Sequence, residues 1–565
     1  MSKRHISTTV SRRALLAGIA GAAAFSALPT PLLAHAEPDN PLFRHGVASG
    51  DPDQTSVVLW TRVSNSGPAT VTWELAETSG FDAVIKGGTF ETGPERDYTV
   101  KLLATGLQPG GQYYYRFRKD GVTSPIGRTR TLPDGHLDRL GIALASCSNY
   151  AFGFFNAYDA IAKDADVEFI LHTGDYIYEY GADSWGAETA RAIGRDHVPA
   201  HEIVSLDDYR LRHAQYKSDP GAQAMHGAHP LLACWDDHES ANNPWTGGAQ
   251  NHQPENEGDW LARRAASIRA YYEWMPVREP EWLAEKGRTR MQFWRNYRFG
   301  DLATLFTLET RHTARAKQID YREWAERIEE NGSAETFTQE VLGEAGRRML
   351  SPELERDLSA ALTRSAKNGE PWRLIGNPMP VARMPVPDLV KLGVLAQPAA
   401  GENQQPAAME LAWKGKWNLP IYPDTWDGYP WARERLYDLS RKAGAGDLVF
   451  LTGDSHAFWA NRLADGKGRP AGIEIGTAGI SSPGDFVASG FGNDLSRKID
   501  RALAGHMDEV VWTDNMHQGY VRLELRPQAG SATYIAVDTV LAPRYRTSAV
   551  QRFEFARKNT SVDFV

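Results

Sequence analysis

The sequence predicts a layered α/β domain that is preceded by a small all-β domain. Short alternating segments separated by Gly/Pro turns fill residues 42–133, which is typical of a β-sandwich. Beyond residue 134, apolar runs end in polar clusters and alternate with helical segments, as in layered enzymes that carry their sites at strand ends. The chain is 42% hydrophobic and 24% charged, which excludes collagen-like and wholly disordered proteins.

Residues 1–36 have the pattern of an export signal. Arg12 and Arg13 precede an apolar stretch at residues 14–28, and the Ala-His-Ala motif at residues 34–36 suits cleavage. Paired arginines before a weakly apolar core resemble a twin-arginine signal, with an ordinary Sec signal as the alternative. We therefore expect the twin-arginine translocase as an export partner and a periplasmic or secreted location. The apolar stretch is shorter than the roughly 20 residues that span a bilayer, so no stable membrane span is expected.

The charge balance argues against nucleic-acid binding as a primary role. The chain has 62 Lys plus Arg against 71 Asp plus Glu, a net charge of −9. Removal of residues 1–36 takes away four cations and no acids, which leaves −13. Binding to a phosphate backbone requires a basic face, and no block of five or six basic residues occurs in the sequence. The site that binds an anionic substrate must therefore supply the positive charge itself, and a cluster of metal ions would be sufficient.

The N-terminal domain is expected to cover residues 37–134 and to resemble a fibronectin-type β-sandwich. Its predicted strands are residues 57–63, 70–75, 98–102 and 113–118. Gly/Pro turns separate these strands, and the segment that begins at Leu107 resembles the corner of fibronectin-type domains. No chemistry-bearing cluster occurs here, so we expect a structural role.

The larger domain is expected to cover residues 135–565, including a C-terminal tail at residues 544–565. Its predicted strands are residues 140–145, 167–171, 230–235, 303–308, 372–375 and 448–451. Residues 158–163 and 260–274 are predicted helices between them. Residues 388–420 show little periodicity and are predicted to form a long loop.

Three motifs at strand ends carry the predicted chemistry. A dinuclear phosphoesterase requires a bridging carboxylate, oxygen and nitrogen ligands on each cation, and a proton donor beside the leaving group. Asp175 follows a glycine at a strand end and suits the bridge, while Asp237 offers a ligand with His238 beside it. Asp454 and His456 are two positions apart in an extended segment, so both side chains can serve adjacent metals from one face.

With these motifs the chain resembles the alkaline phosphatase D (PhoD-like) family of the calcineurin-like metallophosphoesterase superfamily. The similarity covers nearly all of the mature chain. Its motifs are residues 46–52 and 59–62, Ser146-Cys147, Asp175 with Tyr178, residues 235–239 with Asn242, residues 426–430, residues 453–456 with Trp459, and Gly519-Tyr520. The resemblance implies a four-layer α/β/β/α metallophosphoesterase domain with the metals at the strand ends, and it agrees with twin-arginine export.

The resemblance also implies ferric iron and calcium as cofactors, with two calcium ions expected. The implied iron ligands are Cys147, Asp175, Tyr178 and His456. The implied calcium ligands are Asp175 as the bridge, Asp237, Asp454 and Asn242. The ligand chemistry is consistent, because a phenol with a pKa of about 10 needs a strong Lewis acid and a thiolate prefers iron to calcium.

The implied function is an exported, metal-dependent phosphatase that hydrolyses phosphate mono- and diesters by attack of a metal-bound hydroxide. His238 is the expected proton donor or oxyanion stabiliser. Arg311 is a candidate phosphate contact and Asn377 a candidate metal ligand, although Glu309 stands where this family more often has aspartate. One alternative is a phospholipase D-type phosphodiesterase acting on phospholipids or teichoic-acid-like polymers. Another is a non-catalytic exported binding protein, which would lack the ligands that this chain keeps.

Several residues also fit structural roles. Cys147 fits a buried thiol or a disulfide with Cys234, and Tyr178 fits an ordinary aromatic side chain. Asp236 fits a cap of the turn that follows it. A pair of histidines, His197 and His201, has the i, i+4 spacing of helical metal ligands. However, a proline separates the two, which favours solvated loop histidines.

A tryptophan-rich stretch has two interpretations. It contains Trp413, Trp417, Trp426 and Trp431. These side chains fit either a lid over the site or the packing of a long loop.

Overall fold

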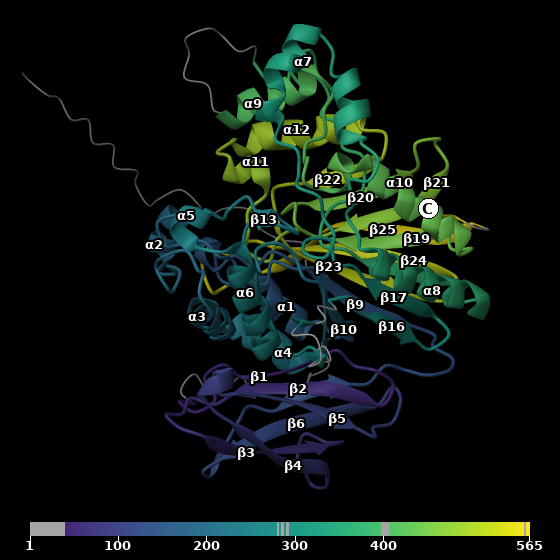
Figure 1. Cartoon of the computed structure of the whole chain (residues 1–565). Helices are drawn as coiled ribbons and strands as arrows, with labels where there is room; N and C mark the ends of the chain where they lie inside the picture. The colour runs from purple at the N-terminus through teal and green to yellow at the C-terminus, as the bar shows by residue number, and fades with distance from the viewer. Residues whose placement is uncertain (1–39, 280–281, 284–287, 290–292, 397–405, 559–560) are drawn as a thin grey trace, which may run out of the picture.

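Two mixed β-sheets face each other at the centre of the molecule, with helices on both outer faces (Figure 1). The computed structural model describes residues 40–279, 282–283, 288–289, 293–396, 406–558 and 561–565. The predicted export signal, residues 1–36, lies outside the described residues. Apolar side chains from both sheets, such as Leu144, Leu171, Leu374 and Val449, form one buried core between them. This arrangement confirms the predicted layered fold.

The first large sheet has ten strands in the order β26-β25-β24-β23-β9-β10-β11-β1-β2-β5. Their bounds are β26 (Ser561–Phe564), β25 (Thr547–Lys558), β24 (Ala529–Val537), β23 (Gln518–Leu525), β9 (Leu140–Ala145), β10 (Phe169–His172), β11 (Leu231–Ala233), β1 (Val47–Gly50), β2 (Ser56–Arg62) and β5 (Thr99–Thr105). The outer face of this sheet packs on α1 (Asn156–Lys163), α3 (Leu206–Lys217), α4 (Pro220–Ala228) and α6 (Trp260–Trp274).

The second sheet has seven strands in the order β16-β17-β18-β19-β21-β20-β22. Their bounds are β16 (Asn296–Phe299), β17 (Ala303–Thr307), β18 (Trp372–Gly376), β19 (Leu448–Thr452), β21 (Pro470–Gly476), β20 (Phe458–Ala464) and β22 (Val510–Asp514). Its outer face packs on α8 (Pro352–Asn368), α10 (Pro430–Lys442) and α12 (Asn493–His506).

Helix α8 illustrates how local sequence sets these elements. Ser351 caps its first turn by accepting a hydrogen bond from the Leu354 N–H, and Pro352 occupies the first position. Gly369 ends the helix in the left-handed conformation, at φ 72°. The apolar residues of α8, including Leu354 and Leu358, are spaced to form one face and are buried against the second sheet.

The N-terminal strands form a β-sandwich at one end of the molecule, as the sequence predicts (Figure 1). One layer contains β4 (Val84–Thr92), β3 (Ala69–Ala76), β6 (Gln112–Lys119), β7 (Val122–Thr123) and β8 (Gly127–Arg130). The other layer is β1, β2 and β5, and a shared apolar core lies between the two. This second layer continues the ten-stranded sheet, because β1 pairs in parallel with β11 at Gly50 and Leu231. The sandwich is therefore more closely joined to the rest of the chain than a linker at residue 134 implies.

The prediction of a long loop at residues 388–420 is wrong in part, because α9 (Pro406–Lys416) lies within it. This helix packs with α7 (Ala325–Asn331) in a small separate core at the top of Figure 1. Trp413 and Trp417 belong to this core, and the indole N–H of each donates to Glu329 at 3.0 Å. A lone helix with one small apolar face gives a weak periodic signal, which explains the error.

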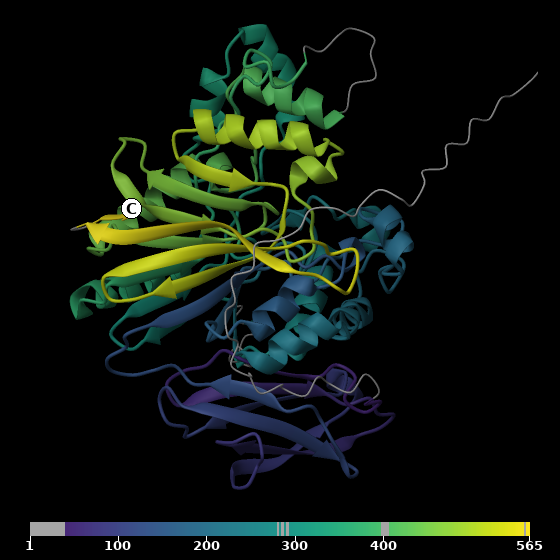
Figure 2. The ribbon, with the colours of Figure 1, turned by 180° about the vertical axis from the view of Figure 1, so that it is seen from behind.

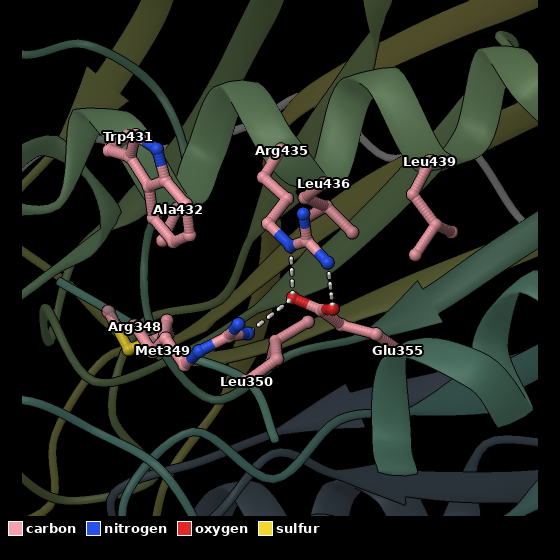
Figure 3. A pocket seen from close by; sticks show the side chains of 9 residues that line it. All are labelled: Arg348, Met349, Leu350, Glu355, Trp431, Ala432, Arg435, Leu436 and Leu439. Carbon is pink, nitrogen blue, oxygen red and sulfur yellow. Dashed lines mark hydrogen bonds and ion pairs between the residues drawn. The ribbon is translucent and has the colours of Figure 1, made fainter. Parts of the chain in front are cut away.

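The other two tryptophans of the stretch also take part in packing. Trp426 is fully buried in the core beneath the second sheet. Trp431 lines a small pocket with Arg348 and Arg435, whose guanidinium groups both pair with Glu355 (Figure 3). These positions favour packing over a lid.

Three further α-helices and two short antiparallel strand pairs lie in the described chain. They are α2 (Ala187–Ile193), α5 (Pro254–Glu257), α11 (Asp485–Ala488), the pair β12 (Pro244–Trp245) with β13 (Gly248–Ala249), and the pair β14 (Trp282–Leu283) with β15 (Arg288–Thr289). The C-terminal tail supplies β25 and β26 at the edge of the ten-stranded sheet (Figure 2). None of the described helices has the length and apolar composition to cross a bilayer.

Candidate metal centre

The carboxyl ends of strands from both sheets deliver the predicted site residues to one place. Strands β9, β10 and β11 run parallel, and so do β17, β18, β19 and β21. Cys147 follows β9, Asp175 follows β10, Asp237 follows β11, Arg311 follows β17 and Asp454 follows β19. Parallel strands present their carboxyl ends at the same edge, which is why residues far apart in the sequence meet here.

Four residues of the site have the left-handed backbone conformation that non-glycine residues rarely adopt. Their φ angles are 59° at Cys147, 56° at Asp175, 65° at Asp454 and 53° at His456. Such conformations persist only where the surrounding structure imposes them, and they concentrate at functional sites.

Two glycines allow the strands to approach closely enough for the site to form. At Gly174, which has a φ of 106°, a Cβ atom would collide with the side chain of Asp236. At Gly453, a Cβ atom would collide with the hydroxyl of Ser146. The Gly-Asp pairs noted in the sequence therefore have a steric reason at both positions.

The four predicted iron ligands lie together. The Cys147 Sγ lies 3.5 Å from Asp175 Oδ2, and the Tyr178 hydroxyl lies 3.2 Å from the same oxygen. The Tyr178 hydroxyl also lies 3.1 Å from His456 Nε2. Cys147 and Cys234 are both free, so the disulfide alternative is wrong.

Four carboxylates form a second cluster that shares Asp175 with the first. Oxygens of Asp175, Asp236, Asp237 and Asp454 all lie within 4.8 Å of one another. Arg311 is fully buried against them, with Nε 2.6 Å from Asp236 Oδ1 and a terminal nitrogen 3.3 Å from Asp454 Oδ2. Asp236 is thus a member of the acidic cluster, and its interpretation as a turn cap alone is wrong.

The donor set of these clusters fits bound cations. Asp236 Oδ2 is a buried acceptor without a hydrogen-bond donor, which is costly unless a cation faces it. Asp237 Oδ1 also lacks a hydrogen bond and lies 3.5 Å from a terminal nitrogen of Arg311. Burial raises the pKa of Asp175 well above its usual range and that of Asp454 to about 7, with nearby carboxylates adding to both shifts. Burial, followed by the charge of Asp175, also raises the pKa of the Cys147 thiol. A coordinated cation reverses shifts of this kind by favouring the ionised ligand.

His238 is held by a buried carboxylate. Its Nδ1 lies 2.6 Å from Glu179 Oε2, and its ring stacks on Tyr178 with centroids 4.2 Å apart. The other Glu179 oxygen accepts hydrogen bonds from the Asn242 backbone N–H and the Asn251 side chain. Burial alone lowers the pKa of His238, but Asp237 and Glu179 raise it well above the usual range. The imidazole is therefore fixed in place by Glu179, and the surrounding carboxylates favour its protonated form where no cation offsets their charge.

Comparison with known proteins agrees with this geometry. Residues 142–534 match the PhoD-like phosphatase family, and residues 27–133 match the N-terminal domain of PhoD-like phosphatases. Alkaline phosphatase D of Bacillus subtilis (strain 168) is 32% identical over 540 residues, which cover 92% of this chain and 82% of that protein. The chain belongs to the PhoD-like phosphatase family. A solved structure of PhoD superposes with a TM-score of 0.74 at 29% identity, covering 93% of this chain and 92% of the other.

Membership of the PhoD-like family supports phosphatase activity, which is the coarse part of the predicted function. The match to the PhoD structure also supports the predicted fold class over nearly the whole chain.

Two of the predicted metal ligands in this chain, Asn242 and Asn377, make other contacts. The Asn242 side chain donates to Gln250 at 3.1 Å, and its backbone supports Glu179. The Asn377 side chain donates to the Met379 carbonyl and accepts from Trp426 at 3.2 Å. Asn377 directly follows β18, and both contacts engage its side-chain amide in packing.

The two histidines of the i, i+4 pair lie in different environments. His201 is exposed, as expected for a solvated loop residue. His197 is buried instead, and its Nε2 lies 3.3 Å from the Tyr216 hydroxyl. The interpretation as solvated loop histidines is therefore right for His201 and wrong for His197.

Sequence reasoning missed two residues of the site, Glu179 and Ser482. The Ser482 hydroxyl lies 2.9 Å from the Tyr178 hydroxyl and follows β21, a strand that was not predicted. The signal that could have indicated it is the polar cluster after residues 471–475, a short segment that is apolar except for Glu474. Glu179 directly follows Tyr178 in the chain, but only the fold brings it to His238.

Proposed function

We propose that this PhoD-like protein is a metal-dependent phosphatase that hydrolyses phosphate mono- and diesters. The supporting observation is that Asp175 is common to three groups of ligand atoms at one set of strand ends. The groups are Cys147/Asp175/His456, Asp175/Asp237/His238 and Asp175/Asp236/Asp237/Asp454. A carboxylate shared in this way suits a bridge between cations.

The residues divide by ligand chemistry. Cys147, Tyr178 and His456 would hold ferric iron with Asp175, because thiolate, phenolate and imidazole suit iron. Asp236, Asp237 and Asp454 would together hold calcium through hard oxygen atoms. When bound, the metal ions would supply Lewis acidity at the phosphorus and an ionised water.

Two residues of the chain act directly on the substrate in this proposal. His238 donates the proton that the leaving oxygen requires, and Glu179 holds the imidazole in position for the transfer. Arg311 is the candidate phosphate contact. Its side chain is fully buried and paired with Asp236 and Asp454, so a contact with phosphate requires the 3.3 Å pair with Asp454, whose side chain is 20% exposed, to open.

We extend the proposal to export. Arg12 and Arg13 precede an apolar stretch of signal type, so the translocase of the twin-arginine route is the proposed partner and a periplasmic or secreted location follows. A folded, metal-loaded protein is compatible with that route.

Metal analysis with matched cysteine variants tests the ligand assignment. We expect iron and calcium in the purified protein, with a visible absorption from phenolate bound to iron. Cys147→Ala is expected to lose iron and at least about 100-fold in activity, because a ligand is removed. Cys234→Ala is the control, since this thiol is equally buried but lies outside the ligand groups. A colourless, iron-free and fully active protein would contradict the assignment.

An activity panel tests the substrate class. Phosphate monoesters, phosphate diesters and phospholipids are compared on the same preparation. Hydrolysis of both mono- and diesters is expected, whereas activity confined to phospholipids would identify a phospholipase D-type enzyme. Absence of all hydrolysis in metal-loaded protein would leave only the binding-protein alternative.

A further inference from the structure

Two partly exposed aromatic side chains, Tyr180 and Trp185, border the ligand clusters on the side of the two imidazoles. The Tyr180 ring lies 5.2 Å from the ring of His238. The Trp185 ring stacks on His456 with centroids 5.6 Å apart and planes 13° from parallel. The two aromatic rings also contact each other, at 6.0 Å in an edge-to-face arrangement. Both lie in the segment between β10 and α2, and the proposed chemistry uses neither.

Trp185 is the centre of a larger aromatic surface. Its ring lies 4.6 Å from Phe152 and 6.1 Å from Tyr178. Tyr178 is fully buried, whereas Phe152, Tyr180 and Trp185 each keep part of their surface exposed. Exposed aromatic side chains beside a buried polar site are suited to contact the apolar part of a ligand.

The position of the proton donor decides which part of the substrate meets this surface. The leaving oxygen takes its proton from His238 and must therefore lie within hydrogen-bond reach of that imidazole. The group attached to this oxygen then lies next to Tyr180, which is in contact with His238, and next to Trp185 beyond it.

An acidic side chain outside the proposed metal ligands limits the charge of that group. Asp485 Oδ1 lies 3.7 Å from His456 Nδ1, and the Asp485 side chain is 36% exposed. A carboxylate that reaches solvent here disfavours a leaving group that carries a negative charge.

We propose that Trp185 and Tyr180 form a leaving-group subsite that favours phosphate esters of uncharged alcohols with an aryl or other flat apolar face. This inference rests on the proposed function, because it takes His238 as the proton donor. Contact with the aromatic faces is expected to strengthen binding of an aryl group about tenfold relative to methyl.

Competitive inhibition by two phosphonates tests the subsite. Phenylphosphonate and methylphosphonate carry the phenyl or methyl group on a carbon–phosphorus bond, in the place of the leaving group. In the metal-loaded wild-type protein, phenylphosphonate should inhibit about tenfold more tightly than methylphosphonate. Trp185→Ala should bring the ratio of the two inhibition constants close to one, and Trp185→Phe should preserve most of it.

The ratio separates a subsite from a structural role. Damage to the metal ligands or to folding weakens both phosphonates equally and leaves the ratio unchanged. Tyr180→Leu, with Tyr180→Phe as its control, provides a second pair in case Trp185→Ala does not fold. An unchanged ratio in both truncated variants overturns the subsite while the phosphatase proposal stands. If neither phosphonate inhibits and no ester is hydrolysed, both proposals fail.

Discussion

At the scale of single residues, the pair of His238 and Glu179 is the main addition to the predicted site. The carboxylate is fully buried and lies 2.6 Å from the imidazole, so it fixes the ring and stabilises its protonated form. The proposed proton donor is thus oriented by a neighbour that, in the same proposal, touches no substrate. Loss of Glu179 should therefore affect esters whose leaving group needs a proton more than esters whose leaving group does not.

Glu179→Gln should slow the hydrolysis of alkyl phosphates about 10–100-fold, because the protonated imidazole loses its carboxylate partner. The 4-nitrophenyl ester should be slowed much less, since nitrophenolate leaves without a proton. Turnover rates for the two substrates provide the measurement. Glu188→Gln, an exposed position on α2, serves as the control and should change neither rate. Equal losses on both substrates would show that Glu179 only supports the fold.

At the scale of elements, the last residue of α3 is an unusual buried amine. Lys217 is 1% exposed, and its Nζ lies 2.8 Å from His226 Nε2 and 3.1 Å from the Tyr176 hydroxyl. The indole ring of Trp60 lies 5.2 Å away. All of these described partners are neutral, and burial lowers the pKa of Lys217 well below its usual range. The amine is therefore destabilising whenever it must be protonated.

Lys217→Met should increase the free energy of unfolding near pH 7 by about 1–3 kcal/mol, since a desolvated amine is removed. The midpoint of thermal unfolding should therefore rise. The hydrogen bond between Tyr176 and His226, 2.9 Å long, does not depend on the lysine.

The pH dependence has a defined sign. The folded-state pKa of Lys217 is lower than the unfolded value, so the unfolded chain binds one more proton between the two pKa values. Stability of the wild type therefore rises with pH through this interval, and the advantage of Lys217→Met shrinks. Calorimetry at several pH values measures this, with the exposed Lys163→Met as the control. A destabilised Lys217→Met protein at every pH would contradict the account.

At the scale of the whole molecule, Asp51 joins the N-terminal sandwich to the larger domain. It follows β1, is 2% exposed, and accepts hydrogen bonds from Arg295 at 3.0 Å, from the Arg278 backbone at 2.8 Å and from Tyr297 at 3.1 Å. Together with the pairing of β1 and β11, this buried network makes the sandwich part of the catalytic scaffold.

Asp51→Ala should cost about 3 kcal/mol, because the guanidinium of Arg295, whose side chain is 20% exposed, loses the buried carboxylate that accepts its hydrogen bond. Asp53→Ala is the matched control: its side chain is 46% exposed and pairs with Arg278, so a loss of about 0–1 kcal/mol is expected. Thermal unfolding, combined with limited proteolysis around residues 131–139, measures both effects. Equal stability of the two variants would show that the strand pairing alone holds the sandwich.

The sequence by itself determined the layered fold class and the strand-end positions of most of the residues that meet at the site. Each of these follows from local patterns: apolar runs of strand length, and polar residues directly after them. Cys147, Asp175, Asp237 and Asp454 were predictable in this way, because parallel strands bring their carboxyl ends together regardless of what lies between them.

Only the tertiary structure decided which neighbours act with these residues. Asp236 joins the carboxylates, Glu179 holds His238, Asn377 is used by Trp426, and the sandwich continues the main sheet. Glu179 and His238 are 59 residues apart, and no local period relates them. Such pairings depend on how strands and loops approach in space, and the free energy that selects them comes from packing across the whole chain rather than from any segment of it.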